Sequence, residues 1–275
     1  MKKVLSVLLA ALMMFSVVSL FAACSKDTST QDTTGASDAA STDSDLAYVQ
    51  NKGTLVVGIT EYEPMNYKDE NGEWTGFDTE FAQAVGEKLG VDVEFTEINW
   101  DYKYNELDSK SIDCIWNGMT ITDEGKEAAS ISNAYAENAQ VVVMNQENLS
   151  KYTDAQSLKD LTIAVEGGSA GEKAAATAGL TNTVVSNTQA LALTEVSSGS
   201  CDACIIDLTM ANSMTGEGTS NANLGFEIRL EAEEYGIAFR KDSDLTDKVN
   251  EIMAELMNDG TLDALAEKYD INLIK

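Results

Sequence analysis

Short apolar segments rich in β-branched residues alternate with helical patterns twice along this chain. The first series has predicted strands at 55–59, 91–98 and 112–116, and predicted helices over 79–89, capped by Asp78, and 102–109. A β-α-β-α-β order predicts a mostly parallel sheet that is covered on both faces. The first part of the folded chain is therefore expected to form one α/β unit.

A second series follows a polar stretch at 145–156, which predicts a crossover between two units. The remaining predicted elements are strands at 140–144, 161–165, 183–185, 203–206 and 234–239, and helices over 170–178, 188–198, 245–257 and 261–268. Two α/β units on one chain predict a cleft between two lobes. Ligands of open parallel sheets bind outside the carboxyl ends of the strands, so residues directly after strands are the first candidates for a site.

Residues 1–23 predict a secretion signal. Lysines follow Met1, and the apolar run 4–18 is shorter than the ~20 residues of a membrane span. The small residues Ala22 and Ala23 precede Cys24, which resembles a bacterial lipobox and implies lipidation of Cys24. The alternative is an ordinary signal peptide with a chance cysteine. The lipobox places the protein outside the cytoplasm, lipid-anchored to the outer face of the bacterial cytoplasmic membrane.

The segment after the cysteine is predicted to be a tether. Residues 25–44 are almost entirely Ser, Thr, Asp, Ala, Gln and Gly, with nothing to bury. The lipidated cysteine and a disordered linker therefore account for 24–45, and folded sequence is expected from near Leu46.

Composition excludes several classes of partner and catalyst. The chain has 18 Lys+Arg and 46 Asp+Glu, and its net charge of −28 repels nucleic acid and anionic lipid. It has no histidine, which removes Ser-His-Asp and Cys-His nucleophile systems and His metal sites. Cys201 and Cys204 have C-x-x-C spacing but run into a predicted buried strand, which favours a core role for Cys204 over a redox or metal site. No metal or cofactor is expected.

Several segments, taken in order, resemble one family. They are Gly58–Met65, Gly76–Asp78, Ile112–Thr122, Gly168-Ser169, Asp202–Asp207 and Gly236–Lys241. Their order and spacing are similar to the extracellular solute-binding lipoproteins of amino-acid ABC importers, family 3, across nearly all of 46–275. The resemblance implies an α/β, two-lobed periplasmic-binding-protein-like fold of type 2 with a hinge and an interlobe cleft. Lobe 1 would hold 46–142 plus 237–275, and lobe 2 would hold 146–235. It also implies a monomer that closes on a small-molecule ligand and docks on a membrane permease.

Ligand-binding candidates follow from these motifs. They are Tyr62, Trp100, Asn117, Gly118, Thr120, Gly168, Ser169, Ala170 and Asp207, with Glu61, Trp116 and Lys126 as further candidates. The resemblance implies that Asp207 binds the ligand α-ammonium, while the alternative is that it caps a helix over 208–214. The resemblance also implies aromatic stacking by Tyr62 and Trp100, with core packing as the alternative for Tyr62 and Trp116.

Two loops after strands supply polar groups. Asn117 to Thr120 are predicted to leave their strand as a loop, in which Gly118 lets a backbone carbonyl approach a ligand. Ser169 and Glu172 form an S-x-x-E capping box. The free N–H groups of that helix start suit a carboxylate, and capping alone is the alternative.

The chain departs from the family at one ligand position. Most members have an arginine there that grips the ligand α-carboxylate, and this chain has Gly125; Ala170 likewise replaces a threonine. Lys126 could supply the charge, the helix start with Thr120 could hold the carboxylate, or the ligand could lack an α-carboxylate. Because acids outnumber bases, a small zwitterionic or cationic ligand is expected.

Three functions remain open from the sequence. The first is capture of an amino acid or similar solute without chemistry. The second is a cleft enzyme on the same fold, dehydratase or transglycosylase-like, with a buried acid among Glu61, Glu63 and Glu166. The third is a sensor that presents its ligand to a receptor. Paired carboxylates with a recognisable spacing are missing from the sequence, which favours binding.

Overall fold

The computed structural model describes residues 44–275. The predicted signal peptide, Cys24 and the linker up to residue 43 lie outside the described residues. The folded part begins with helix α1 (Asp45–Lys52), which Ser44 caps by accepting a hydrogen bond from the Ala47 backbone N–H. Within this part, none of the helices is both long and apolar enough to cross a membrane.

The elements follow the two predicted series closely. The other helices are α2 (Phe77–Leu89), α3 (Lys103–Asp108), α4 (Asp123–Ala128), α5 (Ala170–Thr177), α6 (Gln189–Ser197), α7 (Leu208–Met214), α8 (Leu245–Asn258) and α9 (Thr261–Tyr269). The strands are β1 (Thr54–Ile59), β2 (Tyr67–Lys68), β3 (Trp74–Thr75), β4 (Asp92–Glu97), β5 (Cys114–Thr120), β6 (Ser130–Ile131), β7 (Ala136–Asn145), β8 (Ile163–Glu166), β9 (Thr183–Ser186), β10 (Ala203–Asp207) and β11 (Leu224–Phe239). Short 3₁₀ helices cover Trp100–Tyr102, Gln146–Lys151 and Ala155–Leu158.

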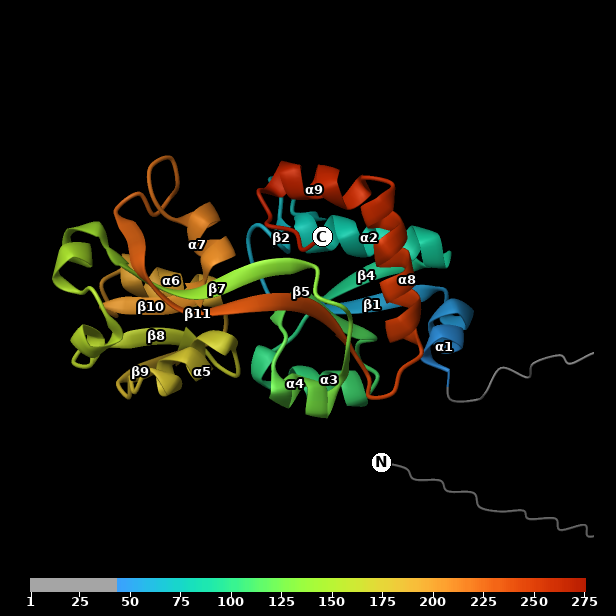
Figure 1. Ribbon diagram of the computed structural model, residues 1–275, viewed down its shortest axis with the longest axis horizontal. Coiled ribbons are helices and arrows are strands. Elements are labelled where there is room, and N and C mark those ends of the chain that lie inside the picture. The colour runs from blue at the N-terminus through green and yellow to red at the C-terminus, as the bar shows by residue number, and fades with distance from the viewer. Residues whose placement is uncertain (1–43) are drawn as a thin grey trace, which may run out of the picture. The chain divides into compact units, whose positions relative to one another are not determined.

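One large sheet runs through residues 44–275 (Figure 1). Its strand order is β4-β1-β5-β11-β7-β10-β8-β9, with β6 beside β11. Strand β1 is parallel to β4 and β5, and β8 is parallel to β9 and β10, as a βαβ order requires. The prediction of a mostly parallel sheet is therefore confirmed within each α/β unit.

Two long strands join the parallel groups. β7 and β11 are antiparallel to each other. β7 is also antiparallel to β10, and β11 is also antiparallel to β5. They connect an α/β lobe with α1 to α4, α8 and α9 to a second lobe with α5 to α7 (Figure 1). We propose that the lobe boundaries lie within these strands, as predicted from the sequence.

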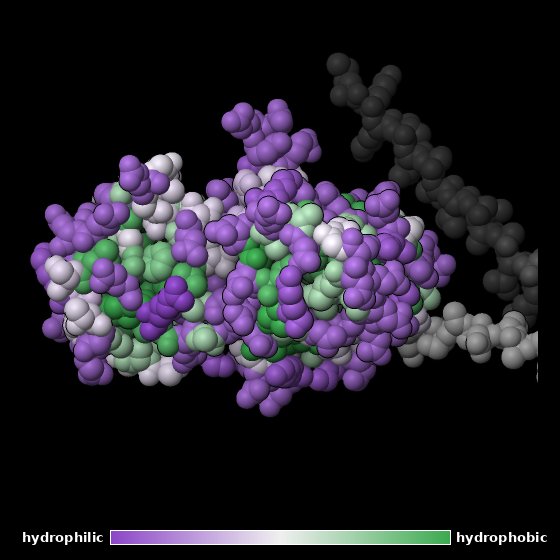
Figure 2. All heavy atoms as spheres, turned by 45° about the horizontal axis from the view of Figure 1, so that its top comes forward, coloured by the Kyte–Doolittle hydropathy of each residue, from purple (hydrophilic) through white to green (hydrophobic). Residues whose placement is uncertain are grey.

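Buried aromatic rings fill the core of the first lobe. The Phe81 ring stands edge-on to Trp116 at a centroid distance of 4.7 Å and to Tyr135 at 5.7 Å. Such pairs contribute about 0.5–1.5 kcal/mol beyond the area they bury. In the second lobe the Cys204 side chain is buried in the core, which confirms its predicted core role. Hydrophilic residues cover most of the face shown in Figure 2, as the excess of acids leads one to expect.

Two local predictions, the cap at Asp78 and the loop at 117–120, were wrong. Helix α2 begins at Phe77 with Gly76 as its N-cap, so Asp78 lies inside the helix. The buried Asp78 carboxylate accepts hydrogen bonds from the Gly118 N–H (2.6 Å) and the Tyr135 hydroxyl (3.0 Å). Strand β5 also continues through Thr120, so 117–120 is not a loop. Gly118 allows this because its φ of 55° is one that other residues rarely adopt.

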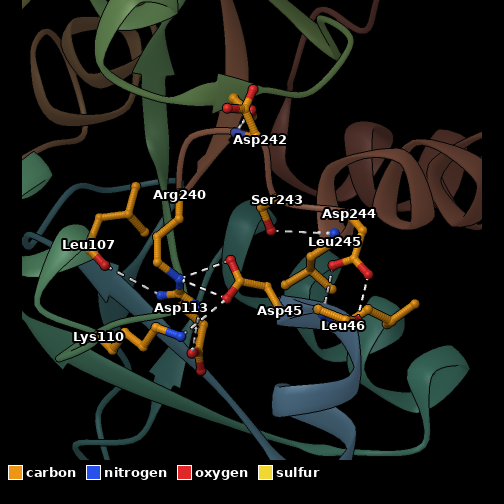
Figure 3. A network of polar contacts seen from close by, with 12 residues as sticks. Asp45, Leu46, Leu107, Lys110, Asp113, Arg240, Asp242, Ser243, Asp244 and Leu245 are labelled. Atoms are coloured by element: carbon orange, nitrogen blue, oxygen red, sulfur yellow. Dashed lines mark hydrogen bonds and ion pairs between the residues drawn. The ribbon is translucent and has the colours of Figure 1, made fainter. Parts of the chain in front are cut away.

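A buried ionic network fixes the start of the folded chain (Figure 3). Nε of Arg240, directly after β11, donates to the Asp45 carboxylate at 2.9 and 3.0 Å. The same guanidinium donates to the Ile112 carbonyl at 2.8 Å and lies 3.4 Å from Asp113. Lys52 pairs with the other oxygen of Asp113 at 2.5 Å. The network therefore joins α1 to β11 and to the loop before β5.

Candidate functional site

A cavity of about 530 Å³ lies between the two lobes. Its volume is typical of sites for small molecules. Its lining includes residues at the carboxyl ends of parallel strands or just after them: Trp100 after β4, Asn117 to Thr120 on β5, Glu166 on β8, Gln189 after β9 and Asp207 on β10. Two lobes with parallel strands bring these ends together, as the topology predicts.

Most of the candidate residues meet in this cavity. Those that line it are Trp100, Asn117, Gly118, Thr120, Gly168, Ser169, Ala170 and Asp207. The Asn117 side chain is already used, because its amide oxygen accepts from the Thr60 N–H (3.0 Å) and hydroxyl (2.9 Å). Asn117 therefore joins β5 to the residue that follows β1.

Four candidates are not part of the cavity lining. Tyr62 is buried, and its hydroxyl lies 2.6 Å from the Tyr235 hydroxyl. Trp116 packs in the aromatic core, and Glu61 is exposed. Lys126 lies beside other cavities, next to Ile121 and Glu234. This geometry does not support Lys126 as the cation that replaces the family arginine.

The Asp207 carboxylate is held by three side-chain amides. Asn138 donates to its Oδ1 at 2.7 Å and Gln140 at 2.6 Å, while Gln189 donates to Oδ2. Asp207 stands at the N-cap of α7, but its side chain makes no capping hydrogen bond. The capping alternative is therefore wrong, because the amides hold the carboxylate at the cavity wall instead.

A second acid shares these amides. Oε1 of Glu233, on β11, accepts from Asn138 and, at 2.8 Å, from Gln140. Burial and the neighbouring Asp207 raise the pKa of Glu233 to about 9, and burial also raises the pKa of Asp207. The raised pKa of Glu233 favours its protonated form near neutral pH, while the three amide donors favour the ionised form of Asp207. The sequence analysis did not single out Glu233. It lies in the acidic segment Glu231-Ala232-Glu233-Glu234, in which no pattern distinguishes one acid from the others.

Glu166 is a buried acid in the cavity wall. Its side-chain Oε1 has no hydrogen-bond partner among the described residues. Burial, and then the charge of Asp207, raise the pKa of Glu166 to about 8, while Lys103 and Gln189 act in the opposite direction.

Lys103 is a buried cation in the same wall, and it belongs to no motif that the sequence analysis singled out. Its Nζ donates to the Gly168 carbonyl at 2.8 Å and to the Trp100 carbonyl at 3.2 Å. Its Nζ also lies 5.0 Å from the centre of the Trp100 ring. Burial lowers the pKa of Lys103. Because Lys103 begins α3 and Gly168 follows β8, this hydrogen bond bridges the two lobes beside the cavity.

Gly125 lies behind the cavity wall. A Cβ at this position would stand 3.0 Å from the Tyr104 hydroxyl and 3.2 Å from the Thr122 hydroxyl, and both residues line the cavity. An arginine side chain here would therefore have to displace Tyr104. Within the described part of the chain, the basic residues that line the cavity are Lys103 and Lys173.

The start of α5 forms only half of the predicted capping box. The Ser169 hydroxyl accepts from the Glu172 N–H at 3.2 Å, as predicted. The Glu172 carboxylate, however, accepts from the Gly168 N–H at 2.8 Å and not from Ser169. The box prediction is wrong in this half, because the Ser169 N–H turns to the Glu166 carbonyl at 3.3 Å. One donor near the helix start is thus already taken by a carboxylate.

Buried acids make the unliganded protein less stable as the pH rises. The pKa of Asp78 is raised to about 7 and that of Glu166 to about 8, in both cases mainly by burial. Between the ordinary pKa and the raised one, the folded chain holds a proton that the unfolded chain has lost. The free energy of unfolding therefore falls with pH by up to about 1.4 kcal/mol per pH unit for each group, from near pH 4 to pH 7 for Asp78 and to pH 8 for Glu166.

We therefore expect thermal unfolding of the unliganded protein at a higher temperature at pH 5 than at pH 8. The variant Glu166→Gln should show a shallower dependence on pH, since one of the groups is removed. A wild-type unfolding temperature that rises between pH 5 and pH 8 would contradict this account.

Comparison with known proteins agrees with the fold. The sequence profile of the bacterial extracellular solute-binding proteins, family 3, matches residues 55–271. The arginine-binding extracellular protein ArtP of Bacillus subtilis is 34% identical over 230 residues, which cover 79% of this chain and 86% of that protein. The L-cystine-binding protein TcyA of Bacillus subtilis is 33% identical over 267 residues, which cover 95% and 96% of the two chains.

A solved structure agrees as well. It is an ancestral amino-acid-binding protein described as a precursor of cyclohexadienyl dehydratase. Its TM-score is 0.76 at 32% identity, over 82% of this chain and 99% of that one. The mixed α/β architecture with two lobes is that of the type 2 periplasmic binding proteins. The chain belongs to the bacterial extracellular solute-binding proteins of family 3 and has their substrate-binding role.

Proposed function

We propose that the protein captures a zwitterionic or cationic amino acid in the interlobe cavity and delivers it unchanged to an ABC permease. The observation that carries this proposal is the Asp207 carboxylate, which lies at the cavity wall with three amide donors already in place. Preorganised acceptors of this kind suit a ligand ammonium, since a charge-assisted hydrogen bond contributes about 1.5–3 kcal/mol.

Lys103 is proposed to bind the ligand carboxylate in place of the missing arginine. Among residues 44–275, the Gly168 and Trp100 carbonyls accept from two of its three N–H donors, so one donor remains. Its Nζ lies beside the α5 helix start, whose N–H groups favour an anion. Trp100, which lines the same wall, supplies an apolar surface for the ligand side chain.

The cellular setting is also proposed. A lipid on Cys24 and the tether would hold the binding protein at the membrane close to its permease, as the lipobox implies. The family resemblance implies that it acts as a monomer. The proposed lobes are bridged by the Lys103–Gly168 bond and by a hydrogen bond of 3.1 Å from Ser213 to Glu63. Bonds of this kind favour a closed arrangement around a ligand.

An enzyme on this fold is the second candidate. The observation in its favour is Glu166, a buried acid whose pKa of about 8 suits proton transfer near neutral pH. Long incubation of the protein with each ligand that binds, followed by mass spectrometry, separates the two functions. We expect the ligand to be recovered unchanged. Chemical conversion of the ligand would contradict the binding proposal and favour an enzyme.

Calorimetric titration tests the proposal. The purified protein, unfolded and refolded to remove carried-over ligand, is titrated with a panel that includes arginine, cystine, histidine and glutamate. We expect micromolar or tighter binding of at least one amino acid. No binding across the panel, or tight selective binding of glutamate, would contradict the proposal.

The variant Lys103→Gln tests the carboxylate role. If arginine is a ligand, its affinity should fall about 10- to 100-fold, because a charged hydrogen bond is lost. Agmatine, which has the same guanidinium but lacks the carboxylate, is the matched control and should bind both forms equally. A similar loss of affinity for both compounds would show that Lys103 stabilises the closed arrangement of the lobes and does not bind the ligand carboxylate.

A further inference from the structure

We propose that Glu166 is a second ligand-binding carboxylate that pairs with a cationic nitrogen on the ligand side chain, so that the cavity selects amino acids of net positive charge. This inference rests on the proposed function, because it concerns the same cavity.

Glu166 stands where a ligand-binding residue is expected. It ends β8, and Asp207 ends the adjacent parallel strand β10, so both carboxyl groups reach the same edge of the sheet. Both residues line the cavity, and Gln189 lies in the lining with them. The Glu166 side chain is only 2% exposed, and its Oε1 has no partner among the residues that the structure describes.

A buried carboxyl oxygen without a hydrogen-bond partner is unfavourable, and Oε1 of Glu166 has none among residues 44–275. Lys103, the cation in the same wall, is bound to two carbonyl groups, and no ion pair between Lys103 and Glu166 occurs within 4.0 Å among the described residues. Such a group is stable only with a proton or with a cation that enters from outside. A cation on the ligand is therefore the missing partner.

The charges around the cavity favour the same class of ligand. In the described part of the chain, five acids and two bases line it: Asp101, Glu124, Glu166, Glu172 and Asp207 against Lys103 and Lys173. A neutral amino acid would use Asp207 for its ammonium and Lys103 for its carboxylate, and would leave Glu166 without a partner. A ligand with one further cationic nitrogen would satisfy Glu166 as well.

Binding of such a ligand should release a proton. The charged groups that act on Glu166 are Asp207 from β10 and Lys103 from α3, and Asp101, Glu124, Glu172 and Lys173 line the same cavity. In the free protein the raised pKa of Glu166, about 8, keeps this carboxyl mostly protonated at pH 7. A ligand cation favours the ionised form, so the proton leaves as the ligand binds.

Arginine and citrulline test the inference, because they have nearly the same shape and only arginine carries a side-chain cation. The wild-type protein and Glu166→Gln are titrated with both at pH 7, in two buffers of different ionisation enthalpy. Wild type should prefer arginine about 10- to 100-fold, with proton release, as one charged hydrogen bond implies. Glu166→Gln should bind the two compounds with similar affinity and without proton release. Glu97→Gln, which removes an acid at an exposed pair with Lys68, should keep the full preference.

The outcomes separate this inference from the proposed function. Binding of neutral amino acids with no preference for arginine, or an arginine preference that survives in Glu166→Gln, would overturn the role of Glu166 and leave the proposed function standing. An equal loss of preference in Glu97→Gln would also overturn it, because overall charge would then explain the selectivity. Failure of wild type to bind any member of the panel would overturn the proposed function itself.

Discussion

Asp207→Asn is expected to lower the affinity for the amino-acid ligand by about 30- to 1000-fold, or about 2–4 kcal/mol. The substitution keeps the shape of the side chain and one oxygen that can accept from Asn138 and Gln140. It removes the charge that faces the ligand ammonium inside a desolvated cavity. Calorimetric titration of wild type and variant with the same ligand measures the change.

The same variant should remain folded. Burial raises the pKa of Asp207, so its ionised carboxylate costs the unliganded protein free energy that an amide does not. A cooperative thermal transition, no lower than that of wild type at pH 8, would show that lost affinity is not lost structure. Unchanged affinity in a folded variant would remove Asp207 from the site.

Arg240→Met is expected to lower the free energy of unfolding by about 3–5 kcal/mol. Methionine fills much of the same volume, but Asp45 loses the guanidinium that it accepts from at 2.9 and 3.0 Å. Asp113 keeps the Lys52 ammonium and the Val56 N–H as partners, and the Ile112 carbonyl loses a buried donor. Urea unfolding at pH 7 measures the loss, and a constant m value would confirm that the folded state is otherwise the same.

Arg229 provides the matched control. It is the other arginine of the chain, and its side chain is exposed on β11. Arg229→Met should change stability by no more than about 0.5 kcal/mol. Equal effects of the two substitutions would show that loss of positive charge from this acidic protein, and not the buried network, governs the change.

Local sequence signals predicted much of the fold. The strands β1, β4, β8, β9 and β10 were predicted to within about two residues. Four of them are short segments rich in apolar β-branched residues, and β4 alternates apolar and polar residues. The start of β11 was missed, since its first part, Leu224 to Glu233, alternates with acids and exposed residues and lacks an apolar run. Asp78 was misplaced because its buried partners, Gly118 and Tyr135, are distant in sequence.

The candidate site was predicted where its residues follow strands. Asp207 and Thr120 end strands, Ser169 comes three residues after β8, and parallel topology brings such residues together. Lys103 and Glu233 were missed, because their roles come from contacts across the two lobes or across the hinge strands. Glu166 was seen only as a possible catalytic acid, since its burial and its unpaired oxygen are properties of the folded chain.

A crystal structure of the protein with the amino acid that binds most tightly in the titration would test the central claim most directly. We expect the ligand in the interlobe cavity, with its ammonium nitrogen about 3 Å from an Asp207 oxygen and its carboxylate facing Lys103 and the start of α5. A ligand bound elsewhere, for example beside Lys126 and Glu233, or with its ammonium turned away from Asp207, would contradict the account.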